Sequence, residues 1–222
     1  MMLSITREEA DLMRTFTLSL KMKNYRKIIE HFKNKFEQDP DNIENAFNYG
    51  ACMSSYMLID RADFTKANHL FEVNKAFTGC LRQKSAWWLV RFLRSELNTG
   101  LPDEAVGGKI PALKQVKPEE DIKILLEQQH SAAEKFPYFL CPYMSRTRNL
   151  IIQGKLDEAR ESYQLGLAEV KIERSPIYLP YLTWPFFDTV VYFKKLDMHE
   201  IADEIKKISL TLFPNAKNLL SA

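Results

Sequence analysis

The chain has 222 residues, of which 45% are hydrophobic, so it can bury a sizeable core without disulfides or structural metals. Its 31 basic and 29 acidic residues nearly cancel, which leaves no broad basic surface for nucleic acid or acidic lipid. We therefore expect neither a nucleic-acid partner nor a membrane-surface role.

The N-terminal segment is charged from Arg7 onward, and no segment reaches the roughly 18 apolar residues needed to cross a bilayer. Cys52, Cys80 and Cys141 lie far apart in apolar surroundings, which favours buried free thiols in a reducing compartment. The four histidines are equally scattered, without metal-ligand spacing. We expect a cytoplasmic protein with no metal site and no cofactor.

Helical spacing of apolar residues dominates the chain, and sustained alternation typical of strands is almost absent. Thr6 and Glu9 have the spacing of a capping box before the first predicted helix, and Asp41 with Glu44 repeats that spacing further on. The pattern predicts helices over 6–20, 24–40, 45–58, 62–77, 81–97, 118–137, 142–153, 155–170, 184–195 and 198–214. These ranges predict an all-α fold of about ten helices paired into hairpins.

One of these hairpin turns carries a recognisable pattern in "GKLDEARESYQLGL". Gly154 turns the chain, Ala159 permits close helix approach, and Leu156 and Tyr163 fill the space on either side. On these residues, and on partial matches at 24–42, 62–76 and 197–215, the chain resembles the tetratricopeptide repeat (TPR) family, whose two-helix repeat is about 34 residues long.

The resemblance implies an α-α superhelix of about five TPR-like hairpins in a single domain, 1–222. The expected repeats are 6–42, 43–79, 80–137 with an inserted loop at 98–117, 138–175 and 182–215. It also implies an adaptor that binds a protein or peptide in the concave groove lined by the first helix of each repeat. The groove residues carried over from the matching repeats are Arg14, Asn48, Ser55, Arg148, Trp184, Asp188 and Lys195.

The stretch "YLPYLTWPFFDTVVYF", residues 178–193, concentrates aromatic rings. If a helix starts at 184, with Thr183 as its cap and Pro185 in its first turn, Phe186, Val190 and Phe193 share one face. Phe187, Val191 and Lys194 or Lys195 share another, and two apolar faces imply neighbours on both sides. Core packing is the favoured interpretation of the rings, and packing and ligand contact both stay open for Tyr178, Tyr181 and Trp184.

Adjacent Trp87 and Trp88 would point about 100° apart on a helix, so we expect one of them to be partly exposed. Arg91 and Arg94 lie one turn apart, where they either bind a carboxylate or, as we favour, belong to a solvated face.

Catalytic patterns are missing from the sequence. "VGGKIP" lacks the glycine and the Ser or Thr of a phosphate-binding loop, and no nucleophile stands beside a base at local spacing. We expect no enzyme activity and no catalytic residue. Two alternatives stay open: a small-molecule sensor or enzyme with a pocket between loop 98–117 and the 178–188 aromatics, and a homo-oligomer in which another copy fills the groove.

Overall fold

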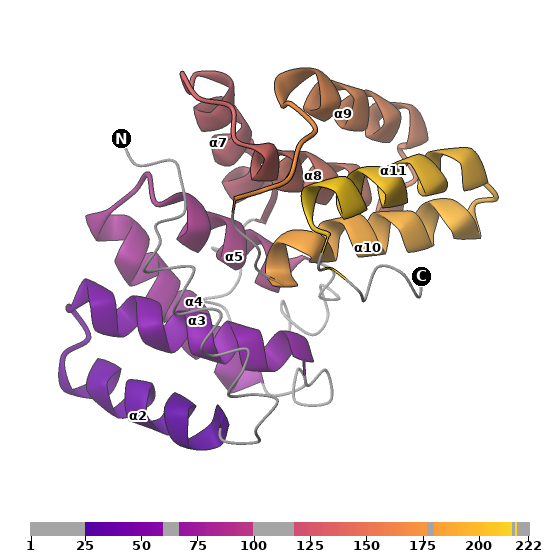
Figure 1. Ribbon diagram of the computed structural model, residues 1–222. Helices are drawn as coiled ribbons and strands as arrows, with labels where there is room; N and C mark the ends of the chain where they lie inside the picture. The colour runs from indigo at the N-terminus through magenta and orange to yellow at the C-terminus, as the bar shows by residue number, and fades with distance from the viewer. Residues whose placement is uncertain (1–24, 60–66, 100–117, 177–179, 215, 217–222) are drawn as a thin grey trace. The chain divides into compact units, whose positions relative to one another are not determined.

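The computed structural model of the protein describes residues 25–59, 67–99, 118–176, 180–214 and 216 (Figure 1). All regular structure in these ranges is helical, which confirms the predicted all-α class. The helices are α2 (Tyr25–Gln38), α3 (Ile43–Ile59), α4 (Ala67–Gln83), α5 (Trp88–Asn98), α7 (Pro118–His130), the short 3-10 helix η3 (Pro137–Phe139), α8 (Leu140–Ile152), α9 (Leu156–Glu169), α10 (Pro180–Lys195) and α11 (His199–Leu212). The helix predicted at 6–20 and the greater part of loop 98–117 fall outside the described residues.

Two compact units, Met1–Asp121 and Ile122–Ala222, make up the chain. In the first unit, α3 packs against α2, α4 and α5, and α4 also packs against α5. In the second, α8 pairs with α9, α10 pairs with α11, and α8 packs against α10 (Figure 1). Each unit therefore contains packed neighbouring helices, and the single repeat domain over the whole chain stays a prediction.

The residue that caps the start of α3 lies one position after the predicted one. The side-chain oxygen Oδ1 of Asn42 accepts hydrogen bonds from the backbone N–H groups of Glu44 and Asn45, at 3.0 and 3.1 Å. Asn42 is thus the capping residue in place of Asp41, because its oxygen satisfies two of the otherwise unpaired N–H groups of the first turn.

The helix predicted over 81–97 is in fact two elements with a turn between them. α4 ends at Gln83, and α5 begins at Trp88. Trp87 therefore precedes the helix, and its ring stacks on Phe47 at 4.7 Å, while Trp88 stacks on Phe92 at 5.2 Å. Both tryptophans are buried, so the expected partial exposure of one of them is wrong. That expectation assumed that both residues lie on one helix, where their side chains would point about 100° apart.

Two helix boundaries in the second half of the chain also differ from their predicted positions. α7 starts at Pro118 as predicted but ends at His130, and Pro137 begins the short helix η3. α10 begins at Pro180, so Thr183 is not its cap and Pro185 lies inside the helix. A proline at the first helical position needs no N–H partner, and Pro180 fills this role in place of Pro185.

The same type of turn joins the two helices within each hairpin of the second unit. Gly154 ends α8 with a φ of 76°, and Asp197, 43 positions later, ends α10 with a φ of 58°. The N–H of Gly154 donates to Ile151 O and that of the next residue to Leu150 O, at 3.0 and 2.9 Å. The N–H groups of Asp197 and the residue after it make the equivalent bonds to Lys194 O and Phe193 O, at 3.1 and 2.9 Å.

This shared turn places α8–α9 and α10–α11 in equivalent registers. Ala159 and Ala202, again 43 positions apart, are both fully buried at the start of their second helices. Ala159 therefore occupies the close-packed position that the sequence predicted for it. The spacing of 43 is longer than the expected 34 or so, because α9 ends at Glu169 and α10 begins only at Pro180.

We expect Asp197→Gly to raise the free energy of unfolding by about 0.5–1 kcal/mol. A left-handed backbone costs a non-glycine residue roughly 1–2 kcal/mol, and the extra freedom of an unfolded glycine offsets about half of that gain. Gly154→Ala at the equivalent turn is the matched control and should destabilise. Urea denaturation of both variants measures the two effects, and a loss of stability in Asp197→Gly would contradict the equivalence of the turns.

Candidate functional site

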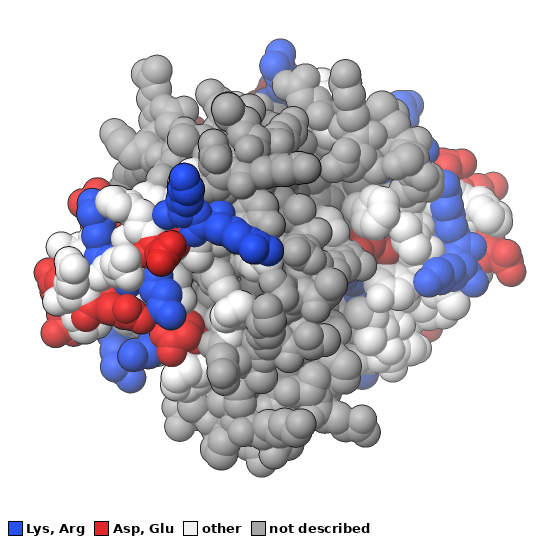
Figure 2. Space-filling view, turned by 90° about the horizontal axis from the view of Figure 1, so that it is seen from below, with Lys and Arg blue, Asp and Glu red and all other residues white. Residues whose placement is uncertain are grey.

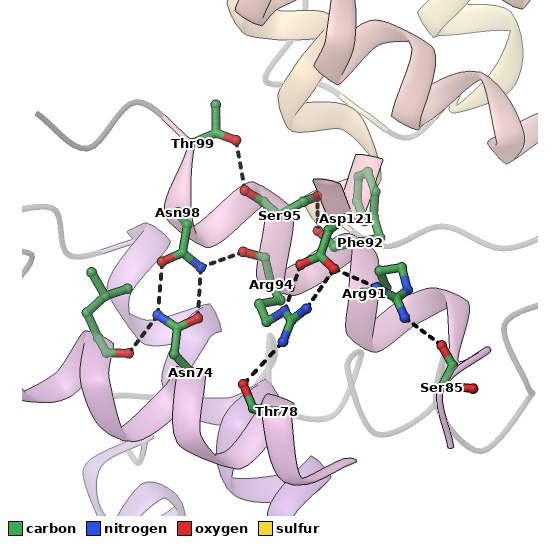
Figure 3. A network of polar contacts seen from close by, with 11 residues as sticks. Asn74, Thr78, Ser85, Arg91, Phe92, Arg94, Ser95, Asn98, Thr99 and Asp121 are labelled. Carbon is green, nitrogen blue, oxygen red and sulfur yellow. Dashed lines mark hydrogen bonds and ion pairs between the residues drawn. The ribbon is translucent and has the colours of Figure 1, made fainter. Parts of the chain in front are cut away.

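A buried ionic cluster joins α4, α5 and the first turn of α7, which is the part of α7 that lies in the first unit (Figure 3). Asp121 accepts hydrogen bonds from Arg91 Nη1 at 2.7 Å and from Arg94 Nε and Nη2 at 2.6 and 2.7 Å. Only 2% of the Asp121 side chain is exposed, against 10% for Arg91 and 16% for Arg94. The carboxylate is therefore held by two arginines away from water.

One further nitrogen of each arginine also donates within the chain, whereas Arg91 Nε is buried without a hydrogen-bond partner among the described residues. Arg94 Nη1 donates to Thr78 Oγ1 at 3.1 Å, and Arg91 Nη2 donates to the carbonyl oxygen of Ser85 at 2.7 Å. The favoured interpretation of Arg91 and Arg94 as a solvated face is wrong, because both are committed to a carboxylate of their own chain. This cluster holds the first turn of α7 against α4 and α5.

The amide pair of Asn74 and Asn98 continues the same network between α4 and α5. Each side chain donates to the other, at 2.9 and 2.8 Å, and each also donates to a carbonyl oxygen of its own helix. Reciprocal bonds of this kind satisfy buried amides and fix the register of two helices. We assign the whole network a structural role.

The predicted groove residues are distributed over both units. Arg14 lies outside the described residues, and Ser55 lies in α3 with a side chain that the structure does not describe. Asn48 is half-buried on α3 in the first unit. The other four lie in the second unit, Arg148 on α8 and Trp184, Asp188 and Lys195 on α10.

Arg148 on α8 and Asp188 on α10 form an ion pair between the two hairpins. Arg148 Nη1 lies 3.4 Å from Asp188 Oδ2. The arginine side chain is only 3% exposed and the aspartate 23%. The expectation that Arg148 is a surface residue is wrong, and a charge reversal there would leave an unpaired buried charge, which is costly.

The two sides of α10 differ in exposure. Leu182, Phe186, Val190 and Phe193 are at most 1% exposed and form the core side. Five residues at helical spacing on the opposite side are half-buried or exposed, and we call them the α10 face: Trp184, Phe187, Asp188, Val191 and Lys195. The Trp184 and Phe187 rings lie 6.1 Å apart, and Lys195 Nζ lies 5.8 Å from the ring centroid of Tyr192.

The corresponding side of α8 is covered by α10. In the 43-residue register, Cys141 and Met144 correspond to Trp184 and Phe187. Cys141 Sγ lies 3.2 Å from Leu182 O, and Thr189 Oγ1 donates to Met144 O at 3.4 Å. Cys141 and Met144 are fully buried by this contact, whereas their counterparts on α10 are half-exposed.

The resemblance transferred Trp184, Asp188 and Lys195 to a groove but not Phe187 and Val191. Periodicity alone had already placed the last two on a second apolar face, which the structure shows to be half-exposed. The sequence predicted that this second face packs against a neighbour, whereas Phe187 and Val191 are only half-buried in the structure.

A second ionic cluster in the second unit caps the end of α7. Lys135 Nζ donates to the carbonyl oxygens of Gln129 and His130 and to Glu169 Oε2, while His130 Nδ1 lies 2.9 Å from Glu169 Oε1. The hydrogen bond from Lys135 lowers the pKa of the Glu169 carboxyl. These contacts satisfy the last carbonyl groups of α7 and have a structural role.

The charged surface and the cysteines give no sign of another site in the described residues. On the face drawn in Figure 2, the described basic side chains lie among acidic ones. The three cysteines are buried and form no disulfide, as predicted, and burial raises the pKa of Cys52 and Cys80 to about 12. Within the described ranges, no three metal-binding side chains gather, and no helix has the length and apolarity to cross a membrane.

Comparisons with protein-family models, with curated proteins and with solved structures found no match to this chain.

Proposed function

We propose that the protein is an interaction module, an adaptor of the TPR-like kind, which binds a protein partner along the α10 face. The observation that carries this proposal is the contrast between α8 and α10: the side that α10 covers on α8 is left half-exposed on α10 itself, and it carries Trp184 and Phe187.

The composition of the α10 face supports this proposal. Aromatic residues are enriched at protein interfaces and dominate their binding energy, since they bury a large area at a small entropic cost. Here Trp184, Phe187 and Val191 form an apolar strip along the helix, and Asp188 and Lys195 lie along one edge of it. This arrangement suits a protein surface or a helix better than a small molecule.

The functional prediction also covers the cellular location, the cofactor and the catalytic activity of the protein. A cytoplasmic adaptor without nucleic-acid binding, cofactor or catalytic activity remains our prediction. The alternative small-molecule pocket would involve residues 100–117, which lie outside the described part of the chain.

Phe187→Glu tests the proposal, because it places a charge in the apolar strip of the α10 face. We expect the variant to keep its helical circular dichroism and to lose the proteins that the wild type captures, as identified by mass spectrometry and then measured with the purified partner. Leu165→Glu on α9 is the matched control, since Leu165 is an apolar residue 48% exposed on another helix. Retention of every partner by Phe187→Glu, or equal loss in Leu165→Glu, would contradict the proposal.

A further inference from the structure

We infer that the α10 face binds the same face of a second copy of this chain, with the two α10 helices antiparallel. This inference rests on the proposed function and names its partner. The sequence leaves open that a second copy fills the groove; the structure points instead to the outward side of α10.

The way in which the two hairpins of the second unit stack indicates that the α10 face fits another helix. α10 stacks on α8 through Leu182 and Thr189, which contact Cys141 and Met144. In a stack of helical hairpins, each first helix is covered by the first helix of the next hairpin, and a terminal hairpin needs a polar outer face to remain soluble. The α10 face has Trp184, Phe187 and Val191 in the equivalent positions, so it is built to be covered by another helix.

The charges on the α10 face favour a second copy and fix its direction. Asp188 lies three residues before Val191, and Lys195 lies four residues after it, which at 1.5 Å per residue places them about 4.5 and 6 Å from Val191 along the axis. A two-fold axis at Val191 therefore brings each Asp188 opposite the Lys195 of the other copy. A parallel pair would instead oppose Asp188 to Asp188, which is unfavourable.

Such an interface is isologous, meaning that both copies use the same patch, and it closes as a dimer without leaving an open end. Asp188 keeps 23% of its side chain exposed beside Arg148, and Lys195 is exposed. Both charges are therefore accessible to an approaching copy while the fold stays intact.

Val191→Cys tests the arrangement, because residues on a two-fold axis meet their own counterparts. The three native cysteines are buried, so the introduced thiol is the reactive one among them. Under mild oxidation we expect a disulfide-linked dimer on a non-reducing gel, formed much faster than in Leu165→Cys. Equal rates in the two variants would overturn the inference.

Sedimentation of the purified chain supplies the second measurement. The wild type should sediment as a dimer, and Lys195→Glu, which opposes two acidic groups across the interface, should weaken the dimer by about tenfold or more. A wild type that is monomeric at every concentration would overturn the inference. If Phe187→Glu nevertheless loses captured partners, the proposed function stands without the dimer. If the variant loses no partner, both the proposed function and the dimer inference fail.

Discussion

Replacing Asp121 by asparagine is expected to lower the free energy of unfolding by about 3–5 kcal/mol. Asp121 is the carboxylate that Arg91 and Arg94 share, and its side chain is 2% exposed. The amide keeps the shape of the side chain but removes its charge, so the two arginines are left in a water-poor site without a counter-ion. Urea denaturation followed by circular dichroism measures the change.

The surface pair Lys33 and Glu37 provides the control for this prediction. Their side chains are 48% and 57% exposed and lie 3.5 Å apart on α2. Exposed pairs of this kind contribute no more than about 1 kcal/mol, so Glu37→Gln should be nearly silent. If Asp121→Asn proved as mild as Glu37→Gln, the cluster would not be what holds the first turn of α7 against α4 and α5.

Phe186→Ala is the second substitution with a large expected effect, again about 3–5 kcal/mol. Phe186 is fully buried on the core side of α10, and its ring lies 6.0 Å from that of Phe213. Removing the ring leaves a cavity among residues that cannot close it completely. Thermal unfolding of the purified variant measures the loss.

The adjacent Phe187→Ala is the matched comparison, since the same ring is removed from the half-exposed face of the same helix. We expect it to cost clearly less stability than Phe186→Ala. Equal losses of stability in the two variants would show that both sides of α10 are core. The α10 face would then not be a binding surface.

Helical periodicity was sufficient to predict the class of the fold and the approximate extent of several helices. α9 was predicted over 155–170 and runs from Leu156 to Glu169, because a glycine before it and a regular apolar stripe within it define both ends. Buried Phe186 and Phe193 were likewise predicted from their spacing. These features depend on neighbours close in sequence, which is why a single sequence shows them.

The features that the sequence did not reveal depend on contacts between distant residues. Asp121 is 27 residues from Arg94 and 30 from Arg91, so no local spacing links them. Trp87 precedes α5, and its ring stacks on Phe47 of α3, 40 residues earlier in the chain. In each of these cases the conformation depends on tertiary packing, which local helix propensity does not determine.

The two sides of α10 follow from local spacing, whereas the use of one of them as a site stays a proposal. Spacing along one helix separated the Phe186 side of α10 from the Phe187 side, since both are properties of that helix. The burial of Arg148 could not be predicted, because it depends on how α10 lies against α8. The family resemblance supplied Trp184, Asp188 and Lys195, and the structure places all three on one face of one helix.

The fluorescence of Trp184 offers the most direct test that the α10 face is an interaction surface. The chain has three tryptophans, and Trp87 and Trp88 are buried in the first unit, so a Trp87→Phe, Trp88→Phe variant reports on Trp184 by itself. We predict that its emission shifts to shorter wavelength and that acrylamide quenches it less as the protein concentration rises or a captured partner is added. Emission and quenching that stay constant under both conditions would contradict the assignment of this face.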